Sequence, residues 1–267
     1  MPHVLRPDGV SIHYESRGEG PLAVLVPYWS WVPGVYDDLL AGLAADHRVL
    51  TCHLRGTGSS TRTGPYDMET DAGDLEAVLE AEDGGAAVLL CVADAVNRAT
   101  RVAVSRPDLV ERVVAFGSLA LPRSAFRESE SLISSETVID AYLDQVQRDF
   151  RGALRASMTA TNPQMTQAEL QDRVSAMVEH SDPEAVVGRI RSWTYDEPLE
   201  HSVALGDRAT MLVSEKGQGG PWFPDSPELE ALVRRLLPEA RVVWLPDGPA
   251  SRPDAAAVAV REVTART

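Results

Sequence analysis

The sequence has few cysteines that could form disulfide bonds and no long apolar run that could anchor it in a membrane. Its 267 residues include only two cysteines, Cys52 and Cys91, and both lie in apolar segments. This excludes a disulfide framework and is typical of a reducing compartment. No apolar run reaches the roughly 20 residues of a membrane-spanning helix. The first residues, MPHVLRPDGVSIHY, lack the pattern of a signal peptide. We therefore expect a cytoplasmic protein without a membrane partner.

Basic residues are also scarce, with 25 Lys and Arg against 40 Asp and Glu, which gives a formal net charge of −15. Such a surface repels phosphate backbones and anionic lipids, so nucleic acid is not an expected partner. The composition itself, 44% hydrophobic, is ordinary for a soluble globular protein, and the expected partner is a small hydrophobic organic ligand or substrate. The composition leaves open whether the chain forms a homo-oligomer.

The residues that hold metals and phosphates are not arranged for that purpose. The histidines are His3, His13, His47, His53, His180 and His201. Neither they nor the cysteines show a metal-ligand spacing, and no glycine-rich loop follows a strand in a phosphate-binding arrangement. We therefore expect no metal and no cofactor.

Apolar segments typical of strands alternate with helical ones along the first half of the chain. The expected strands are 10–18, 22–27, 47–54, 86–92 and 112–119. Continuous apolar runs such as LAVLVP are typical of strands buried on both faces. The alternation predicts an α/β fold, with a mostly parallel central sheet and helices on both faces.

The pattern changes to consecutive helices between about residues 122 and 205. Ser134 is expected to cap the first of these helices, and Thr166 another, with Glu169 completing a capping box. Strand–helix–strand alternation resumes with 209–215, 226–237 and 240–246, followed by a last helix. We therefore predict a core formed by 1–121 and 206–267, with an all-helical cap or lid formed by 122–205.

Two stretches of this layout resemble the α/β-hydrolase family. HLRGTGSS, residues 53–60, resembles the family turn D-x-R-G-x-G-x-S, with histidine in place of aspartate. SRPDLVERVVAFGS, residues 105–118, resembles the family segment that leads into the sixth strand. The resemblance covers the chain from about Val4 onward. It implies the α/β-hydrolase fold and a Ser-His-acid triad, with the serine in a strand–turn–helix elbow, G-x-S-x-G.

The elbow position reads LLCVADAV, residues 89–96, and contains no serine. Ala93 fits the nucleophile position best, because its flanking residues, Cys91 and Ala95, are small enough for a crowded turn. In this register, the Asp94 N–H forms half of the oxyanion hole. If Asp94 held the position instead, it would resemble the nucleophile of haloalkane dehalogenases and epoxide hydrolases, but two valines would flank it. A plain helix cap is a further possible role for Asp94.

The other two triad positions also differ from the family pattern. Where the resemblance implies histidine, the sequence has Pro249 or Ala250, and no histidine follows His201. Where it implies an acid, the sequence has residues 217–219, while Asp225 suits a helix cap. We therefore predict that the triad positions are lost and that the protein is not a serine hydrolase.

Aromatic residues follow the strand at 22–27 and are expected to line a pocket. Tyr28, Trp29 and Trp31 stand where parallel strands end and ligands bind in this fold, so we expect them, with Ala93, to contact substrate. The Trp29 N–H is a second candidate oxyanion donor. His53 either reaches the pocket as a catalytic group or only holds its own turn by a hydrogen bond.

These features predict an atypical enzyme of the α/β-hydrolase fold. Asp94, with His53, would move a proton in a cyclisation, isomerisation or elimination of a small hydrophobic, natural-product-like substrate. Two alternatives remain open at this point. One is an inactive pseudo-hydrolase that binds a small ligand, and the other is a hydrolase with Asp94 as its nucleophile.

Overall fold

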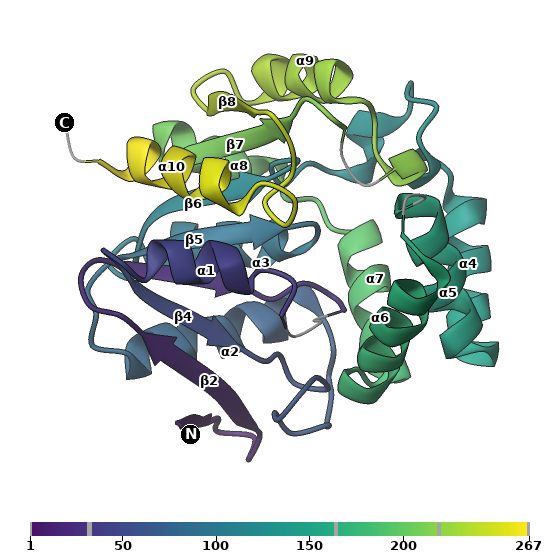
Figure 1. Ribbon diagram of the computed structural model, residues 1–267, viewed down its shortest axis with the longest axis horizontal. Coiled ribbons are helices and arrows are strands. Elements are labelled where there is room, and N and C mark those ends of the chain that lie inside the picture. The colour runs from purple at the N-terminus through teal and green to yellow at the C-terminus, as the bar shows by residue number, and fades with distance from the viewer. Residues whose placement is uncertain (1, 31–33, 163–164, 218–219, 266–267) are drawn as a thin grey trace.

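The chain forms one eight-stranded sheet covered by helices (Figure 1). The computed structural model describes residues 2–30, 34–162, 165–217 and 220–265. The strands are β1 (His3–Leu5), β2 (Ser11–Arg17), β3 (Leu22–Val26), β4 (Arg48–Cys52), β5 (Ala87–Val92), β6 (Val110–Phe116), β7 (Ala209–Ser214) and β8 (Arg241–Leu245). Their order in the sheet is β1-β2-β4-β3-β5-β6-β7-β8.

Pairing is antiparallel between β1, β2 and β4 and parallel between the remaining neighbours. Every residue of β3 and of β7 is buried, as expected for strands covered on both faces. The predicted, mostly parallel α/β fold is thus confirmed. The short edge strand β1 was not predicted, because three residues carry no periodic signal.

Helices cover both faces of the sheet. Helices α1 (Asp37–Leu43) and α10 (Pro253–Thr264) pack together on one face, in a cluster of buried apolar residues. Helices α2 (Met68–Ala81), α3 (Ala95–Ser105) and α9 (Ser226–Leu236) pack on the other face. Because α3 follows β5 directly, the turn between them lies near the middle of the sheet.

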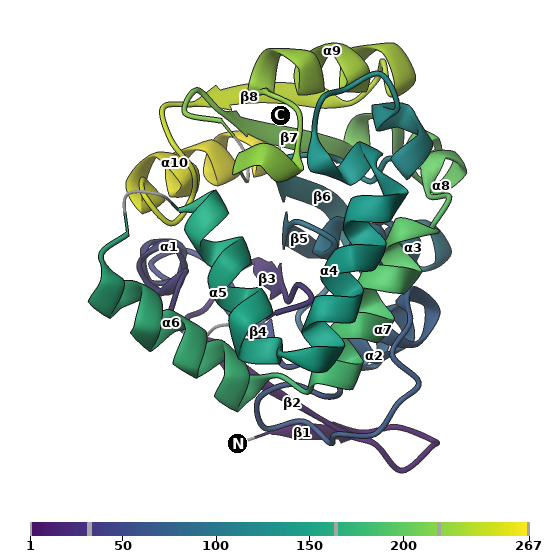
Figure 2. The same cartoon turned by 90° about the vertical axis from the view of Figure 1, so that its right-hand side faces the viewer.

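Five further helices lie between β6 and β7. They are α4 (Glu136–Arg148), α5 (Phe150–Thr161), α6 (Gln167–His180), α7 (Pro183–Thr194) and α8 (Leu199–Leu205). Figure 2 shows α4–α7 lying across one end of the central strands, whereas α8 packs against α3. The division of the chain into a core and a cap stays a prediction, but a block of helices occupies the predicted place.

The helix ends test the capping expectations. Thr166 and Glu169 form the predicted capping box at the start of α6. The predicted cap at Ser134 is wrong by one residue, because the Ser135 hydroxyl accepts the capping hydrogen bond of α4. Asp149 caps α5 and thereby divides one long helical segment into two helices. No helix within the described ranges is long and apolar enough to cross a membrane.

Candidate functional site

The turn between β5 and α3 carries an unusual backbone conformation at Ala93. Its φ is +51°, and Ala93 is the one non-glycine residue of the described ranges with a positive φ. Such strain costs on the order of 1–3 kcal/mol and occurs preferentially at functional sites. The residues two positions away, Cys91 and Ala95, are completely buried, so larger side chains would collide there. Ala93, rather than Asp94, therefore occupies the tip of the elbow.

Two adjoining cavities open beside Ala93, with volumes of about 110 and 150 Å³. They share Ala93, Trp193 and Phe223 as walls. The smaller cavity lies toward the end of β6, at Ser118. The larger one lies beside α4, α5 and α7, which with α6 are called the cap helices below, and its lining includes Trp29 and Asp94. A cavity of about 150 Å³ holds a benzene-sized group, so the pair suits a small two-part molecule.

Asp94 does not cap helix α3 through its side chain. Instead, its buried carboxylate accepts two hydrogen bonds that fix it at the edge of the larger cavity. Oδ1 accepts from the Trp29 N–H at 3.0 Å, and Oδ2 accepts from Arg98 Nη2 at 2.6 Å. The role of the Trp29 N–H as an oxyanion donor stays a prediction, which this bond does not favour, because a carboxylate, a stronger acceptor than a carbonyl, already uses the N–H.

Arg98 joins the elbow to the loop that follows β3. It is completely buried and also donates to the Pro27 carbonyl at 2.7 Å and to Asp71 at 3.3 Å. Burial by itself would lower the pKa of Arg98, but the carboxylates of Asp94 and Asp71 outweigh it and raise the pKa. The guanidinium therefore stays charged and holds both walls of the site in place.

The same network extends into the cap through Arg189 of α7. Arg189 is fully buried and donates to both oxygens of Asp71, at 2.7 and 3.0 Å, and to the Arg55 carbonyl. Because Asp71 contacts both Arg189 and Arg98, one carboxylate links a cap helix to the elbow. This contact fixes α7, and with it Trp193, over the cavities.

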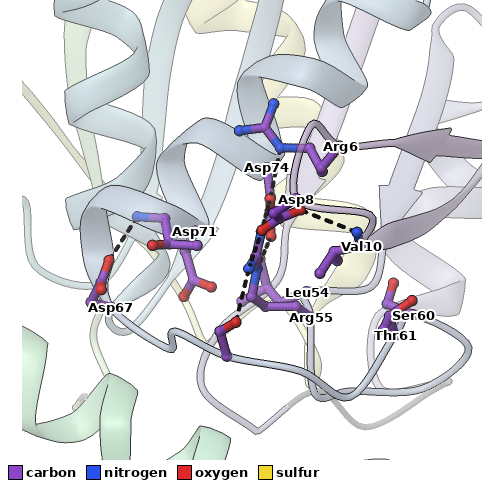
Figure 3. A network of polar contacts seen from close by, with 12 residues as sticks. Arg6, Asp8, Val10, Leu54, Arg55, Ser60, Thr61, Asp67, Asp71 and Asp74 are labelled. Carbon is purple, nitrogen blue, oxygen red and sulfur yellow. Dashed lines mark hydrogen bonds and ion pairs between the residues drawn. The ribbon is translucent and has the colours of Figure 1, made fainter.

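Arg55 stabilises the HLRGTGSS turn from beneath. Figure 3 shows its guanidinium between Asp74 and Asp8, with Arg6 on the other side of Asp74. Two bonds of 2.7 and 2.8 Å join Arg55 to Asp74. Because bidentate arginine–carboxylate pairs fix geometry as well as charge, this part of the family resemblance reflects structure rather than catalysis.

His53 belongs to that turn and not to the cavities at Ala93. Its Nδ1 accepts a hydrogen bond from the Ser59 N–H at 3.0 Å, and its ring packs against His13. The ring also fills the space that a side chain on Gly58 would need. His53 lines a separate hollow beside β2, with Glu15 and Arg17. A catalytic role beside Asp94 stays a prediction that this geometry does not favour.

The environment of His53 predicts how stability depends on pH. Burial, helped by neighbouring His13, lowers the pKa of His53 to about 4 from its ordinary 6.5. Between these values the unfolded chain binds a proton that the folded chain does not, so stability falls as pH decreases from about 6.5 to about 4. His53→Asn keeps an acceptor for Ser59 without titrating. Thermal melts from pH 4 to 7 should therefore give a shallower pH dependence for the variant, and parallel curves would contradict this.

Only some of the residues predicted to contact substrate line the cavities at Ala93. Trp29 and Ala93 line the larger cavity. Tyr28 instead packs between the apolar clusters on the two faces of the sheet and lines neither cavity at Ala93. Trp31 lies outside the described residues. Of the predicted contact residues, the structure thus brings Trp29 and Ala93 together with Asp94.

Sequence reasoning missed the contributions of the cap and of the loop after β7. The larger cavity is also lined by Tyr142, Ser157, Trp193, Trp222 and Phe223. The aromatic character of four of them was a visible signal, but helical periodicity did not show which faces turn toward the core. No histidine of the described ranges lines either cavity, and these ranges hold no cluster of His, Cys, Asp and Glu suited to a metal.

A scan of family models finds none that matches the chain. One curated relative, a pimeloyl-[acyl-carrier protein] methyl ester esterase from Aliivibrio salmonicida, is 26% identical over 149 residues. The match covers 56% of this chain and 54% of that relative, about half of each length.

Solved structures match nearly the whole chain at low identity. An esterase from Thermogutta terrifontis is 19% identical with a TM-score of 0.77, covering 98% of this chain and 96% of that one. A bromoperoxidase from Bacillus anthracis, 17% identical, has a TM-score of 0.78 and the same two coverages. An enol-lactonase from Burkholderia xenovorans, 18% identical, has a TM-score of 0.72 and covers 99% and 100%.

These comparisons correct the function expected from the sequence. An enzyme of cyclisation, isomerisation or elimination was predicted, with an inactive pseudo-hydrolase and a hydrolase with Asp94 as its nucleophile as alternatives. The predicted reaction and the pseudo-hydrolase are wrong, because the curated relative is an esterase and the structural neighbours include esterases and a lactonase. None of these proteins is described as an isomerase, a lyase or a cyclase.

The fold assignment draws on independent features. The motifs HLRGTGSS and SRPDLVERVVAFGS indicate the α/β-hydrolase fold. Three structural features indicate the same fold: the sheet order, the strained turn after β5 and the block of helices between β6 and β7. Structural matches over nearly the whole chain agree with them. The chain has the fold of the α/β-hydrolase superfamily.

Proposed function

We propose that this protein is a hydrolase of small, neutral carboxylic esters or lactones, with its reaction centre at Ala93. The observation that supports this most strongly is the strained elbow, which opens into two apolar cavities, with Asp94 in the wall of the larger one. The bond type is suggested by relatives described as a methyl ester esterase and an enol-lactonase.

A neutral substrate is favoured by the charges around the cavities. Asp94 is the one charged side chain among the described lining residues of both cavities. Arg98 stands behind it, and its charge is already shared by Asp94 and Asp71. An anionic group placed there would meet the carboxylate without a compensating cation, and burying such a group costs several kcal/mol.

In the proposed mechanism, water takes the place of a nucleophilic side chain. The methyl group of Ala93 leaves room for a water beside Asp94, whose two oxygens each keep a lone pair free. Water attacks the carbonyl carbon and its proton passes to the Asp94 carboxylate. The Asp94 N–H, which donates to none of the described residues, faces the developing oxyanion. The C–O bond then breaks, and the leaving oxygen takes the proton from Asp94.

This mechanism excludes an acyl-serine intermediate and predicts no reaction with serine-directed phosphonates. Ser118 and Ser157 line the cavities, but no histidine of the described residues does, and the Ser118 hydroxyl donates a hydrogen bond to the Leu119 carbonyl at 2.8 Å. Without a base, a serine hydroxyl stays a weak nucleophile. A fluorophosphonate probe should leave the intact mass unchanged. A covalent adduct on Ser118 or Ser157 would contradict water attack.

The hydrolase proposal is tested with a pair of phenylalanine substitutions on α5. Ser157→Phe fills the larger cavity, whereas Thr159→Phe adds the same ring to an exposed position two residues away. Hydrolysis of 4-nitrophenyl butyrate and δ-valerolactone would be followed at constant pH. We expect Ser157→Phe to lower kcat/KM at least tenfold and Thr159→Phe to leave it unchanged. If wild type hydrolyses neither compound, or if the two variants behave alike, the proposal fails.

A further inference from the structure

Two polar groups in the wall of the larger cavity have no hydrogen-bond partner among the described residues. They are the Tyr142 hydroxyl, from cap helix α4, and the Trp222 indole N–H, from the loop after β7. The rest of that wall is almost entirely apolar. A buried polar group without a partner costs on the order of 1–3 kcal/mol, so two such groups in one cavity call for an explanation.

The two rings contact each other in the same part of the wall. Their centroids lie 5.4 Å apart, with the planes at 67°, an edge-to-face contact. The contact joins a cap helix to the core, so neither ring turns freely. Tyr142 and Trp222 are far apart in the sequence, and folding of the chain brings them into contact.

Both groups can donate a hydrogen bond, although the tyrosine hydroxyl can also accept one. An indole N–H donates only. Burial raises the pKa of Tyr142 to about 12, so its hydroxyl keeps the proton. Ser157 partly opposes this rise in pKa, but no hydrogen bond of standard geometry joins the two hydroxyls. Each group therefore has a proton to donate, and no acceptor of the described residues bonds to it.

We propose that Tyr142 and Trp222 form a substrate-binding subsite for an uncharged acceptor oxygen, such as a ketone, ether or second ester carbonyl. This subsite would belong to the hydrolase proposed above. It rests on that proposed function only in treating the bound molecule as a substrate. The molecule that fits carries a ring-sized apolar group in the larger cavity, with this oxygen at Tyr142 and Trp222. Its scissile carbonyl lies at Ala93. A charged carboxylate is disfavoured, because Asp94 lines the same cavity and no described cation does.

Binding of two shape-matched probes tests the subsite without any hydrolysis. Acetophenone and α-methylstyrene differ in a carbonyl oxygen replaced by a methylene group. The variants are Tyr142→Phe and Trp222→Phe, which remove one donor each. The control is Trp244→Phe, because the Trp244 N–H already donates to Glu230 at 3.0 Å outside the cavity. Dissociation constants would be measured by titration, following the indole N–H resonances by NMR.

We expect wild type and Trp244→Phe to bind acetophenone about tenfold more tightly than α-methylstyrene, as one or two neutral hydrogen bonds provide. In Tyr142→Phe and Trp222→Phe this ratio should fall below about threefold. The indole resonance that Trp222→Phe removes should also shift when acetophenone is added to wild type. An equal ratio in all four proteins, or no binding of either probe, would overturn the subsite. Failure to hydrolyse esters would leave this result unaffected and would count only against the hydrolase.

Discussion

Replacing Arg98 with methionine should lower the free energy of unfolding by about 3–5 kcal/mol, the usual effect of breaking a buried ion pair from one side. Methionine matches the length of the side chain but leaves the carboxylate of Asp94 without its cation and that of Asp71 with only Arg189. The Pro27 carbonyl also loses its donor. Urea denaturation followed by circular dichroism would measure the change.

Arg106→Met is the matched control, because Arg106 ends the same helix and also pairs with carboxylates. Its partners face solvent, where water replaces the lost contacts and ion pairs contribute little. The midpoint should therefore hardly move. If both variants lost the same free energy of unfolding, the ion pairs of Arg98 would contribute no more than those of a surface arginine. Arg98 would then not hold the site together.

Replacing Asp94 with asparagine should reduce kcat for ester hydrolysis by about 10²–10⁴-fold, the contribution of a general base. Asparagine keeps the shape of the side chain, so KM should change little. The amide has a single acceptor oxygen, so it cannot offer an acceptor at both positions where Trp29 and Arg98 now donate. Initial rates with 4-nitrophenyl butyrate, measured well below the melting temperature of each protein, would give both constants.

Asp71→Asn separates catalysis from the structural effect of disturbing Arg98. Both substitutions take one carboxylate from Arg98, but Asp71 lines neither cavity at Ala93. Asp71→Asn should therefore reduce stability while leaving kcat within a few-fold of wild type. If the two variants lost activity equally, Asp94 would be a positioning residue for the loop after β3 rather than the proton acceptor.

The fold and the elbow were predictable because local signals determine them. Fully apolar strands such as β3 indicate a parallel sheet that is covered on both faces. The small residues at 91 and 95 indicate a crowded turn. The capping box at Thr166 and Glu169 was found for the same reason, since its parts lie three residues apart. The predicted cap at Asp225 is also confirmed by the bond that it accepts from the Glu228 N–H.

The contents of the site could not be predicted, because they depend on long-range contacts. No pattern places Arg189 against Asp71, which lies 118 positions away. The same holds for Tyr142 against Trp222. Asp94 and Trp29 were found, but the hydrogen bonds that Asp94 accepts from Trp29 and Arg98 were not. His53 stands where the family turn predicts, yet its ring faces Ser59 and His13 and not the cavities.

The central claim is that water, rather than an enzyme side chain, attacks the ester at Ala93. Rapid-quench mass spectrometry of the intact wild-type protein during turnover of 4-nitrophenyl butyrate tests it directly, because released nitrophenolate reports turnover in the same sample. We predict turnover well above that of Asp94→Asn, with the protein mass unchanged at every time point. A protein heavier by one butyryl group, or release of nitrophenolate no faster than in Asp94→Asn, would contradict the account.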